Sequence, residues 1–326
     1  MQKLYHAAGL TGIVDPGLTP DMMAVYQNLW ARNELTVRSV LMPLADASLP
    51  VDETLAHIRK FGVRTGFGDA RMKLGAVKVF LDGGASLGTS LMREPYPDER
   101  CNCGIQVTPT DTFRAIVKAC AQQGWSLGVH VVGGKAIDIA LDVFAEVDKD
   151  IPLAPLRFSL IHAYLWPEAR NIREAKRMGI TVATQCSMQY TFGPLLVERF
   201  GTAMMATATP VRSWLDGGVV VGGGSDSPVT PYAPLLGLWQ ARTRRIAGTA
   251  EPVGRLQAVT GEEALAMYTR DAAFVAFSDH ERGMLRAGLL ADWTVLSVDP
   301  VTCEPEALAD ARVLATAVGG EIVHEA

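Results

Sequence analysis

Long hydrophobic runs are missing from this chain of 326 residues. No apolar stretch approaches the roughly 20 residues that a membrane-spanning helix requires, and residues 1–3 (MQK) do not open a signal peptide. A surplus of positive charge is missing too, because the formal net charge is -5, which argues against binding nucleic acid or an anionic membrane surface. We therefore expect a cytoplasmic protein with no nucleic-acid or membrane partner.

Cysteine is also scarce. The chain has five cysteines, an odd number at irregular spacing, which does not favour a disulfide framework. Cys101 and Cys103 form a C-x-C motif, but no second Cys or His pair lies nearby, so two free thiols in a loop are favoured over a metal site. Since 48% of the residues are hydrophobic and 20% are charged, the composition is typical of a globular protein.

Apolar runs of strand length alternate with helical patterns over the first 280 residues. We predict seven strands, at residues 11–15, 38–45, 73–80, 126–132, 158–164, 180–185 and from 219 onward. The expected helices include residues 20–33, 110–123, 135–147 and 167–178. Such alternation predicts parallel βαβ units and an α/β fold. A closed (β/α)₈ TIM-type barrel needs eight strands, so the predicted barrel is one strand short.

The pattern changes toward the end of the chain. Short β segments are predicted at residues 292–297, 313–318 and 321–323, and Gly319 and Gly320 mark a hairpin turn between the last two. A sheet of two or three strands is too small to be stable alone. We therefore expect a small β subdomain that packs on the barrel.

Two histidines and one aspartate stand out among the polar residues on the predicted strands. His130 and His162 lie on consecutive strands in apolar settings, and Asp226 follows the glycines that end the last strand, in residues 219–229 (VVVGGGSDSPV). Each has an ordinary alternative, a core histidine or a turn aspartate. Together they favour a metal site, because imidazole and carboxylate ligands hold zinc and similar divalent ions. The carboxyl ends of barrel strands are where such chemistry is found.

Several short motifs resemble those of amidohydrolase family 3, and they occur in the order typical of that family. They lie at residues 78–83 (KVFLDG), 89–96 (TSLMREPY), 130–133 (HVVG), 161–163 (IHA), 224–229 (GSDSPV), 263–269 (EALAMYT), 288–292 (GLLAD) and 318–320 (VGG). The likeness covers essentially the whole chain and is greatest to the YtcJ-like branch, which includes N-substituted formamide deformylases. It implies a barrel in residues 1–280 and the C-terminal part of a β-sandwich in residues 281–326.

The resemblance also implies an activity, the metal-dependent hydrolysis of a C–N bond in an amide or N-formyl group of a small molecule. Lys78 matches the lysine that family members carboxylate to bridge two metal ions. His130 and His162 match ligands of the second metal. Asp226 matches the carboxylate that binds the first metal and serves as the catalytic proton shuttle.

The expected cofactor is therefore a divalent metal, zinc by preference, with one or two ions. Hydroxide on the metal would attack the carbonyl carbon while Asp226 passes the proton to the leaving nitrogen. We expect Asp82, Gln185 and Tyr96 to bind the substrate.

One departure from the family pattern bears on activity. Family members carry a His-x-His pair on the first barrel strand, and this chain has no His-x-His. Residue 1 also matches a point well inside a full-length member, so we expect the first strand and the N-terminal half of the sandwich to be missing. The alternative function is accordingly a truncated, catalytically inactive barrel, either a fragment or a binding protein. Unpaired strand edges would favour a homodimer.

Overall fold

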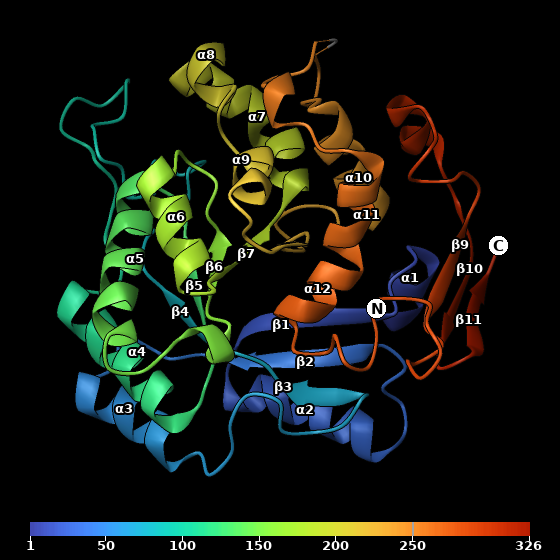
Figure 1. Cartoon of the computed structure of the whole chain (residues 1–326), viewed down its shortest axis with the longest axis horizontal. Helices are drawn as coiled ribbons and strands as arrows, with labels where there is room; N and C mark the ends of the chain where they lie inside the picture. The colour runs from blue at the N-terminus through green and yellow to red at the C-terminus, as the bar shows by residue number, and fades with distance from the viewer. Residues whose placement is uncertain (250) are drawn as a thin grey trace.

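The computed structural model describes residues 1–249 and 251–326, and its centre is formed by parallel strands (Figure 1). A first sheet has the order β1-β2-β3 and consists of β1 (Gly12–Leu18), β2 (Arg38–Pro43) and β3 (Met72–Leu74). A second has the order β4-β5-β6-β7-β8 and consists of β4 (Val77–Phe80), β5 (Leu127–Val131), β6 (Ser159–His162), β7 (Thr181–Thr184) and β8 (Val221–Gly223). A parallel bridge between Leu44 and Lys78 connects the end of β2 to β4.

Helices follow most of the strands. They are α1 (Gln2–Ala7), α2 (Pro20–Ala31), α3 (Val51–Lys60), α4 (Thr110–Gln123), α5 (Gly134–Asp148), α6 (Ala169–Arg177), α7 (Cys186–Phe200), α8 (Thr202–Met205), α9 (Val211–Asp216), α10 (Pro234–Thr243), α11 (Gly261–Tyr268) and α12 (Arg270–Val275). Local signals set their ends: Thr19 accepts a hydrogen bond from the N–H of Met22 at the start of α2, and Gly124 adopts φ 72° to end α4. Within the described part of the chain, no helix is long and apolar enough to cross a membrane.

The main hydrophobic core lies between the second sheet and its helices. Val79 and Val129 on the strands and Phe113 and Phe144 on the helices are fully buried in this core. Because successive side chains of a strand point to opposite faces, the residues between them, such as Lys78, lie on the other face of the sheet. The sheet therefore separates a helix-covered apolar core from a face that carries polar groups.

A third sheet is antiparallel and lies at one side of the molecule next to α1 (Figure 1). Its order is β11-β10-β9, with β9 (Trp293–Leu296), β10 (Val313–Val318) and β11 (Glu321–Glu325). Gly319 and Gly320 form the β10–β11 turn with φ values of 64° and 87°, which glycine adopts without strain. Thr316 and Thr294 donate hydrogen bonds to the carbonyl oxygens of His6 (2.7 Å) and Gly9 (2.8 Å), so this sheet packs against the first helix.

The α/β class with parallel strands is confirmed, and three predicted elements are corrected. The strand expected at residues 73–80 is two strands, because β3 pairs with β2 whereas β4 pairs with β5. The sequence predicts a long connection at residues 186–210 with a helix only around residues 194–200, but α7 begins directly after β7 and covers residues 186–200. The sequence also predicts one helix over residues 260–277, and in the structure this segment divides into α11 and α12 at Thr269. A closed barrel, a missing first strand and a β-sandwich stay predictions.

A buried ion pair connects the antiparallel sheet to β2. Arg38 donates to both carboxylate oxygens of Asp292, with Nε–Oδ2 at 2.6 Å and Nη2–Oδ1 at 2.9 Å. The two side chains are only 7% and 5% exposed. We expect Asp292→Ala to lower the free energy of unfolding by about 3 kcal/mol, because it leaves the guanidinium charge buried without its partner.

Urea unfolding of the purified variants would measure this loss. The matched control is Asp142→Ala, which removes the exposed Arg170–Asp142 pair and should cost less than about 1 kcal/mol. A loss for Asp292→Ala as small as that of the control would contradict the prediction.

A second ion pair should make stability depend on pH. Arg212 on α9 donates to both carboxylate oxygens of Glu263 on α11, at 2.7 and 2.6 Å. The hydrogen bonds from Arg212 are the largest cause that lowers the pKa of Glu263, from 4.5 to about 2. A carboxyl group with a lower pKa in the folded state stabilises the fold above its unfolded pKa and loses that effect as the pH falls toward the folded value.

We therefore expect Glu263→Gln to lower the free energy of unfolding near neutral pH. The difference from the wild type should shrink as the pH falls from 4.5 toward about 2. Denaturant unfolding at a series of pH values would measure it, and a difference that does not change with pH would be evidence against the assigned cause.

Candidate active site

Three of the predicted site residues lie close together toward the carboxyl ends of neighbouring strands. Lys78 on β4 and His162 on β6 are buried, and His130 on β5 is mostly buried, with 15% of its side chain exposed. The imidazole rings of His130 and His162 have their centres 4.5 Å apart, with an angle of 74° between their planes. The positive charge of Lys78 influences the pKa of both histidines. The parallel strands therefore bring these three side chains into one cluster.

Burial decides the protonation states in this cluster. It lowers the pKa of His130 to about 3, and the charge of Lys78 contributes to the same direction. Burial also lowers the pKa of His162 well below its usual value, with further contributions from His130 and Lys78. The pKa of Lys78 falls to about 7 through burial, although the charge of Asp226 opposes this. Both imidazoles are therefore neutral near pH 7, the form that binds a metal ion.

Hydrogen bonds leave one ring nitrogen of each histidine free. His162 Nδ1 lies 2.6 Å from Gln185 Oε1, and because an amide oxygen only accepts, Nδ1 carries the proton and Nε2 has a free lone pair. Gln185 Nε2 donates to the carbonyl oxygen of Ala183 at 3.1 Å, which supports this orientation of the amide. His130 Nε2 donates to the carbonyl oxygen of Gly83 at 3.2 Å, so Nδ1 is free. Such contacts are typical of the groups that orient metal-binding histidines.

Asp226 follows β8 at the same end of the sheet. Burial raises the pKa of its carboxyl group, and the positive charge of Lys78 lowers it in part, so the two groups lie near enough to interact. Asp226 has a left-handed backbone with φ 57°, and His162 has φ 77°. Residues other than glycine rarely adopt this conformation, and those that do occur often at functional sites.

Asp82 and Tyr96, which were predicted to bind substrate, are both buried. The carboxylate of Asp82 accepts hydrogen bonds at 2.9 Å from the N–H groups of Leu91, Val132 and Gly133. Asp82 therefore joins the loop after β4 to the end of β5, and burial raises its pKa to about 7. The Tyr96 hydroxyl donates to the carbonyl oxygen of Ser90 at 3.0 Å, within a separate apolar cluster. The structure does not bring Tyr96 to the cluster of Lys78 and the histidines.

Phe80 also belongs to the site. It lies within the motif at residues 78–83, but that motif predicted no role for it. Its ring centre lies 4.6 Å from Lys78 Nζ and 5.2 Å from the centre of the His130 ring. The available signal was its spacing, because Phe80 is two residues after Lys78 on the same strand and so shares its face.

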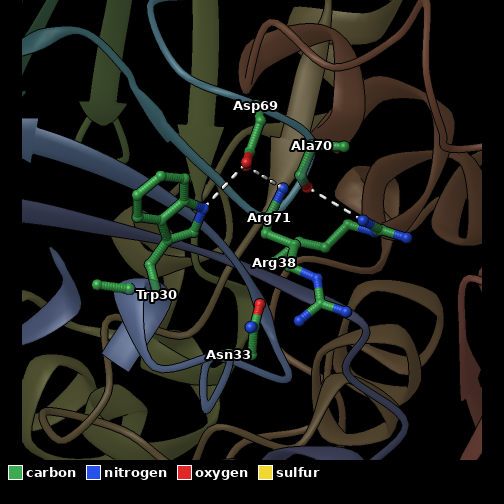
Figure 2. A pocket seen from close by; sticks show the side chains of 7 residues that line it. Trp30, Asn33, Arg38, Asp69, Ala70 and Arg71 are labelled. Atoms are coloured by element: carbon green, nitrogen blue, oxygen red, sulfur yellow. Dashed lines mark hydrogen bonds between the residues drawn. The ribbon is translucent and has the colours of Figure 1, made fainter. Parts of the chain in front are cut away.

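An open pocket with a volume of about 520 Å³ lies elsewhere, beside the start of β2 (Figure 2). Some of its polar groups bond to one another: Trp30 Nε1 donates to Asp69 Oδ2 at 2.9 Å, and Arg38 Nη1 donates to the carbonyl oxygen of Ala70 at 3.1 Å. Because Arg38 is the first residue of β2, this pocket lies at the amino end of that strand. It is therefore separate from the candidate active site.

The side chains of the candidate site supply some, but not all, of the ligands that a metal ion needs. Among residues 1–249 and 251–326, no group of three or more His, Cys, Asp or Glu side chains is placed to hold one. Two neutral imidazoles with free nitrogens are nevertheless available, from His130 and His162. A third ligand would come from Asp226, which the resemblance assigns to a metal, or from Lys78, whose amine becomes a carboxylate donor only if it is carboxylated.

A family model and curated relatives connect this chain to the amidohydrolases. The model of a family described as "Amidohydrolase family" matches residues 1–324. A putative amidohydrolase YtcJ of Bacillus subtilis is 30% identical over 256 residues, which are 78% of this chain and 48% of that protein. An N-substituted formamide deformylase of Arthrobacter pascens is 28% identical over 329 residues, 98% of this chain and 58% of that protein. The chain thus spans about half the length of these curated relatives.

Solved structures of low sequence identity share the fold. An uncharacterized metal-dependent hydrolase from Pyrococcus horikoshii superposes with a TM-score of 0.78 at 22% identity, over 92% of this chain and 58% of that one. Atrazine chlorohydrolase TrzN from Arthrobacter aurescens, complexed with zinc, superposes with a TM-score of 0.59 at 19% identity, over 98% and 69%. With the family match over nearly its full length, the chain belongs to the amidohydrolase family, and the resemblance predicted from its motifs is confirmed.

Proposed function

We propose that this chain carries the active site of a metal-dependent hydrolase that cleaves the C–N bond of a small-molecule amide or N-formyl compound. The observation that carries the proposal is the pair of neutral imidazoles of His130 and His162, 4.5 Å apart beside the buried Lys78. Membership of the amidohydrolase family supports hydrolysis. The relative named as an N-substituted formamide deformylase supports this type of bond.

The metal would be a divalent ion, one or two in number, and we propose zinc because imidazole suits it. His130 Nδ1 and His162 Nε2 would hold it, since the other ring nitrogens are occupied by hydrogen bonds. Carboxylated Lys78 would add oxygen ligands, and its pKa of about 7 leaves part of the amine neutral and able to react with carbon dioxide. When bound, such an ion polarises a carbonyl group and supplies hydroxide near neutral pH.

Asp226 would move the proton. Its carboxylate takes the proton from the attacking water and delivers it to the amide nitrogen as the C–N bond breaks. Burial raises the pKa of its carboxyl group above the usual value, which makes the carboxylate a stronger proton acceptor. Gln185 orients His162 through its 2.6 Å hydrogen bond, and it remains the best placed of the three predicted substrate-binding residues. The contacts of Asp82 favour a positioning role.

We also propose a domain organisation, on the basis of the family resemblance. Residues 1–280 would form the catalytic barrel, and residues 281–326 would be part of a β-sandwich. All five cysteines are free, which agrees with the reducing conditions of the cytoplasm, the proposed location.

Metal content and hydrolysis, measured on the same preparation, would test the function. The metal-free chain would be supplied with zinc, with and without bicarbonate, and bound zinc would be determined by emission spectroscopy. Release of formate from N-substituted formamides would be followed in parallel. We expect bound zinc that increases with bicarbonate, together with formate release. Bound zinc without hydrolysis would favour the inactive barrel, and neither zinc nor hydrolysis would overturn the proposal.

A further inference from the structure

Phe80 is unusually exposed for its position. It is the last residue of β4, where Val77, Lys78 and Val79 are all buried, yet 39% of its surface is accessible. Because side chains alternate along a strand, Phe80 lies on the face of Lys78, away from the helix-covered core that holds Val79. Its exposed surface therefore belongs to the face of the sheet that carries the candidate active site.

The backbone of Phe80 is held in the sheet, and its ring lies against the cluster. The Phe80 backbone pairs with His130 in the sheet, and its carbonyl oxygen accepts a hydrogen bond from Thr108 Oγ1 at 2.5 Å. On one side the ring contacts the cluster, 4.6 Å from Lys78 Nζ and 5.2 Å from the His130 ring centre. The remaining ring surface is an exposed apolar wall next to the groups that would carry out the reaction. Binding pockets are commonly lined by such aromatic surfaces.

Two loops at this end of the sheet also present apolar side chains. Leu87 lies in the loop after β4, and Val229 lies three residues after Asp226; both are exposed. A single exposed apolar side chain is ordinary and needs no explanation. Leu87 and Val229 nevertheless lie in the loops that follow β4, the strand of Lys78, and β8, the strand that leads to Asp226. Their position there agrees with an apolar rim around the site.

We infer that Phe80 is a specificity-determining residue that packs against an apolar, ring-sized substituent of the substrate beside the scissile C–N bond. The inference rests on the proposed function and names its substrate class. The site selects amides or formamides with a bulky apolar group over those with a small substituent.

The test compares two formamides that differ in the size of the substituent on nitrogen, formanilide and N-methylformamide. Formate release gives kcat and KM for each, and titration calorimetry of the zinc-supplied chain gives binding without turnover. Phe80→Ala removes the ring, and Phe80→Leu keeps an apolar group of smaller size. Phe67→Ala is the matched control, because Phe67 is 62% exposed but lies in the loop before β3, beside Gln123 at the end of α4.

We expect the wild type to favour formanilide by at least tenfold, and Phe80→Ala to reduce that preference by about tenfold, mainly through KM and the binding constant. Phe80→Leu should retain part of the preference, and Phe67→Ala all of it. Equal losses for both formamides would overturn the inference, because they indicate a role in positioning Lys78 or His130, while leaving the proposed function intact. If the wild type hydrolyses neither compound, the binding of formanilide measured by calorimetry tests the inference. Weaker binding of formanilide to Phe80→Ala, but not to Phe67→Ala, would support the apolar wall although the proposed function fails, and unchanged binding would overturn both.

Discussion

Replacing Asp226 with asparagine is expected to lower kcat/KM for amide hydrolysis by about a thousandfold, within the range that a positioned general acid–base group supplies. Asparagine has nearly the same shape, and it tolerates the left-handed backbone that Asp226 adopts at φ 57°. It cannot take a proton from water or give one to a leaving nitrogen. The substitution therefore separates proton transfer from the shape of the site.

Formate release and zinc content would be measured together for this variant. Asp111→Asn serves as the control, because Asp111 is an exposed aspartate on α4 and its replacement should leave kcat/KM unchanged. Loss of activity with zinc retained would assign proton transfer to Asp226, whereas loss of both would make it chiefly a metal ligand. Activity within a few fold of the wild type would rule out either role.

The parallel strands could be predicted from sequence because their burial is visible in it. Val77, Val79, Leu127 and Val129 form short apolar runs between turn residues, as expected for strands covered by helices. The division between β3 and β4 could not be predicted in this way, because it depends on which neighbour each strand pairs with. The segment before β4 continues the same apolar pattern, so only the three-dimensional arrangement separates the two.

Helix α7 shows a different reason for failure. Gly193 and Pro194 lie within it, and both residues ordinarily indicate a break in a helix. In the structure, an added Cβ at Gly193 would lie 2.5 Å from the side chain of Ile246. The glycine therefore allows close packing of α7 on a distant segment, and tertiary contact outweighs the local preference.

Some residues of the candidate site could be predicted from the sequence and others could not. His130 and His162 could be identified because two histidines on consecutive strands are uncommon, and parallel strands bring such residues to one end of a sheet. Tyr96 was identified from a family motif alone, and its surroundings are those of a core residue. Phe80 was missed because an apolar residue on a strand is normally part of the core. Its accessible surface, together with its place two residues after Lys78, distinguishes it.

Replacing His162 with alanine is expected to abolish zinc binding and to reduce hydrolysis below detection. The site has two imidazole donors, and Lys78 alone cannot replace the free Nε2 of His162. Gln185→Ala should act on the same atom more weakly. Because Gln185 orients the ring without binding the metal itself, its loss should lower zinc affinity by about 10- to 100-fold, as is typical for such partners.

This graded series tests the assignment more sharply than a single variant. His280→Ala is the control, since His280 lies in an exposed position outside the sheets and should leave zinc affinity unchanged. If His162→Ala kept its zinc, the metal would have to lie elsewhere, and the proposed site would be wrong. If Gln185→Ala lost as much zinc as His162→Ala, the hydrogen bond to Nδ1 would be as necessary as the ligand itself. The expected order of zinc affinity is therefore wild type and His280→Ala, then Gln185→Ala, then His162→Ala, because each step removes a group closer to the metal.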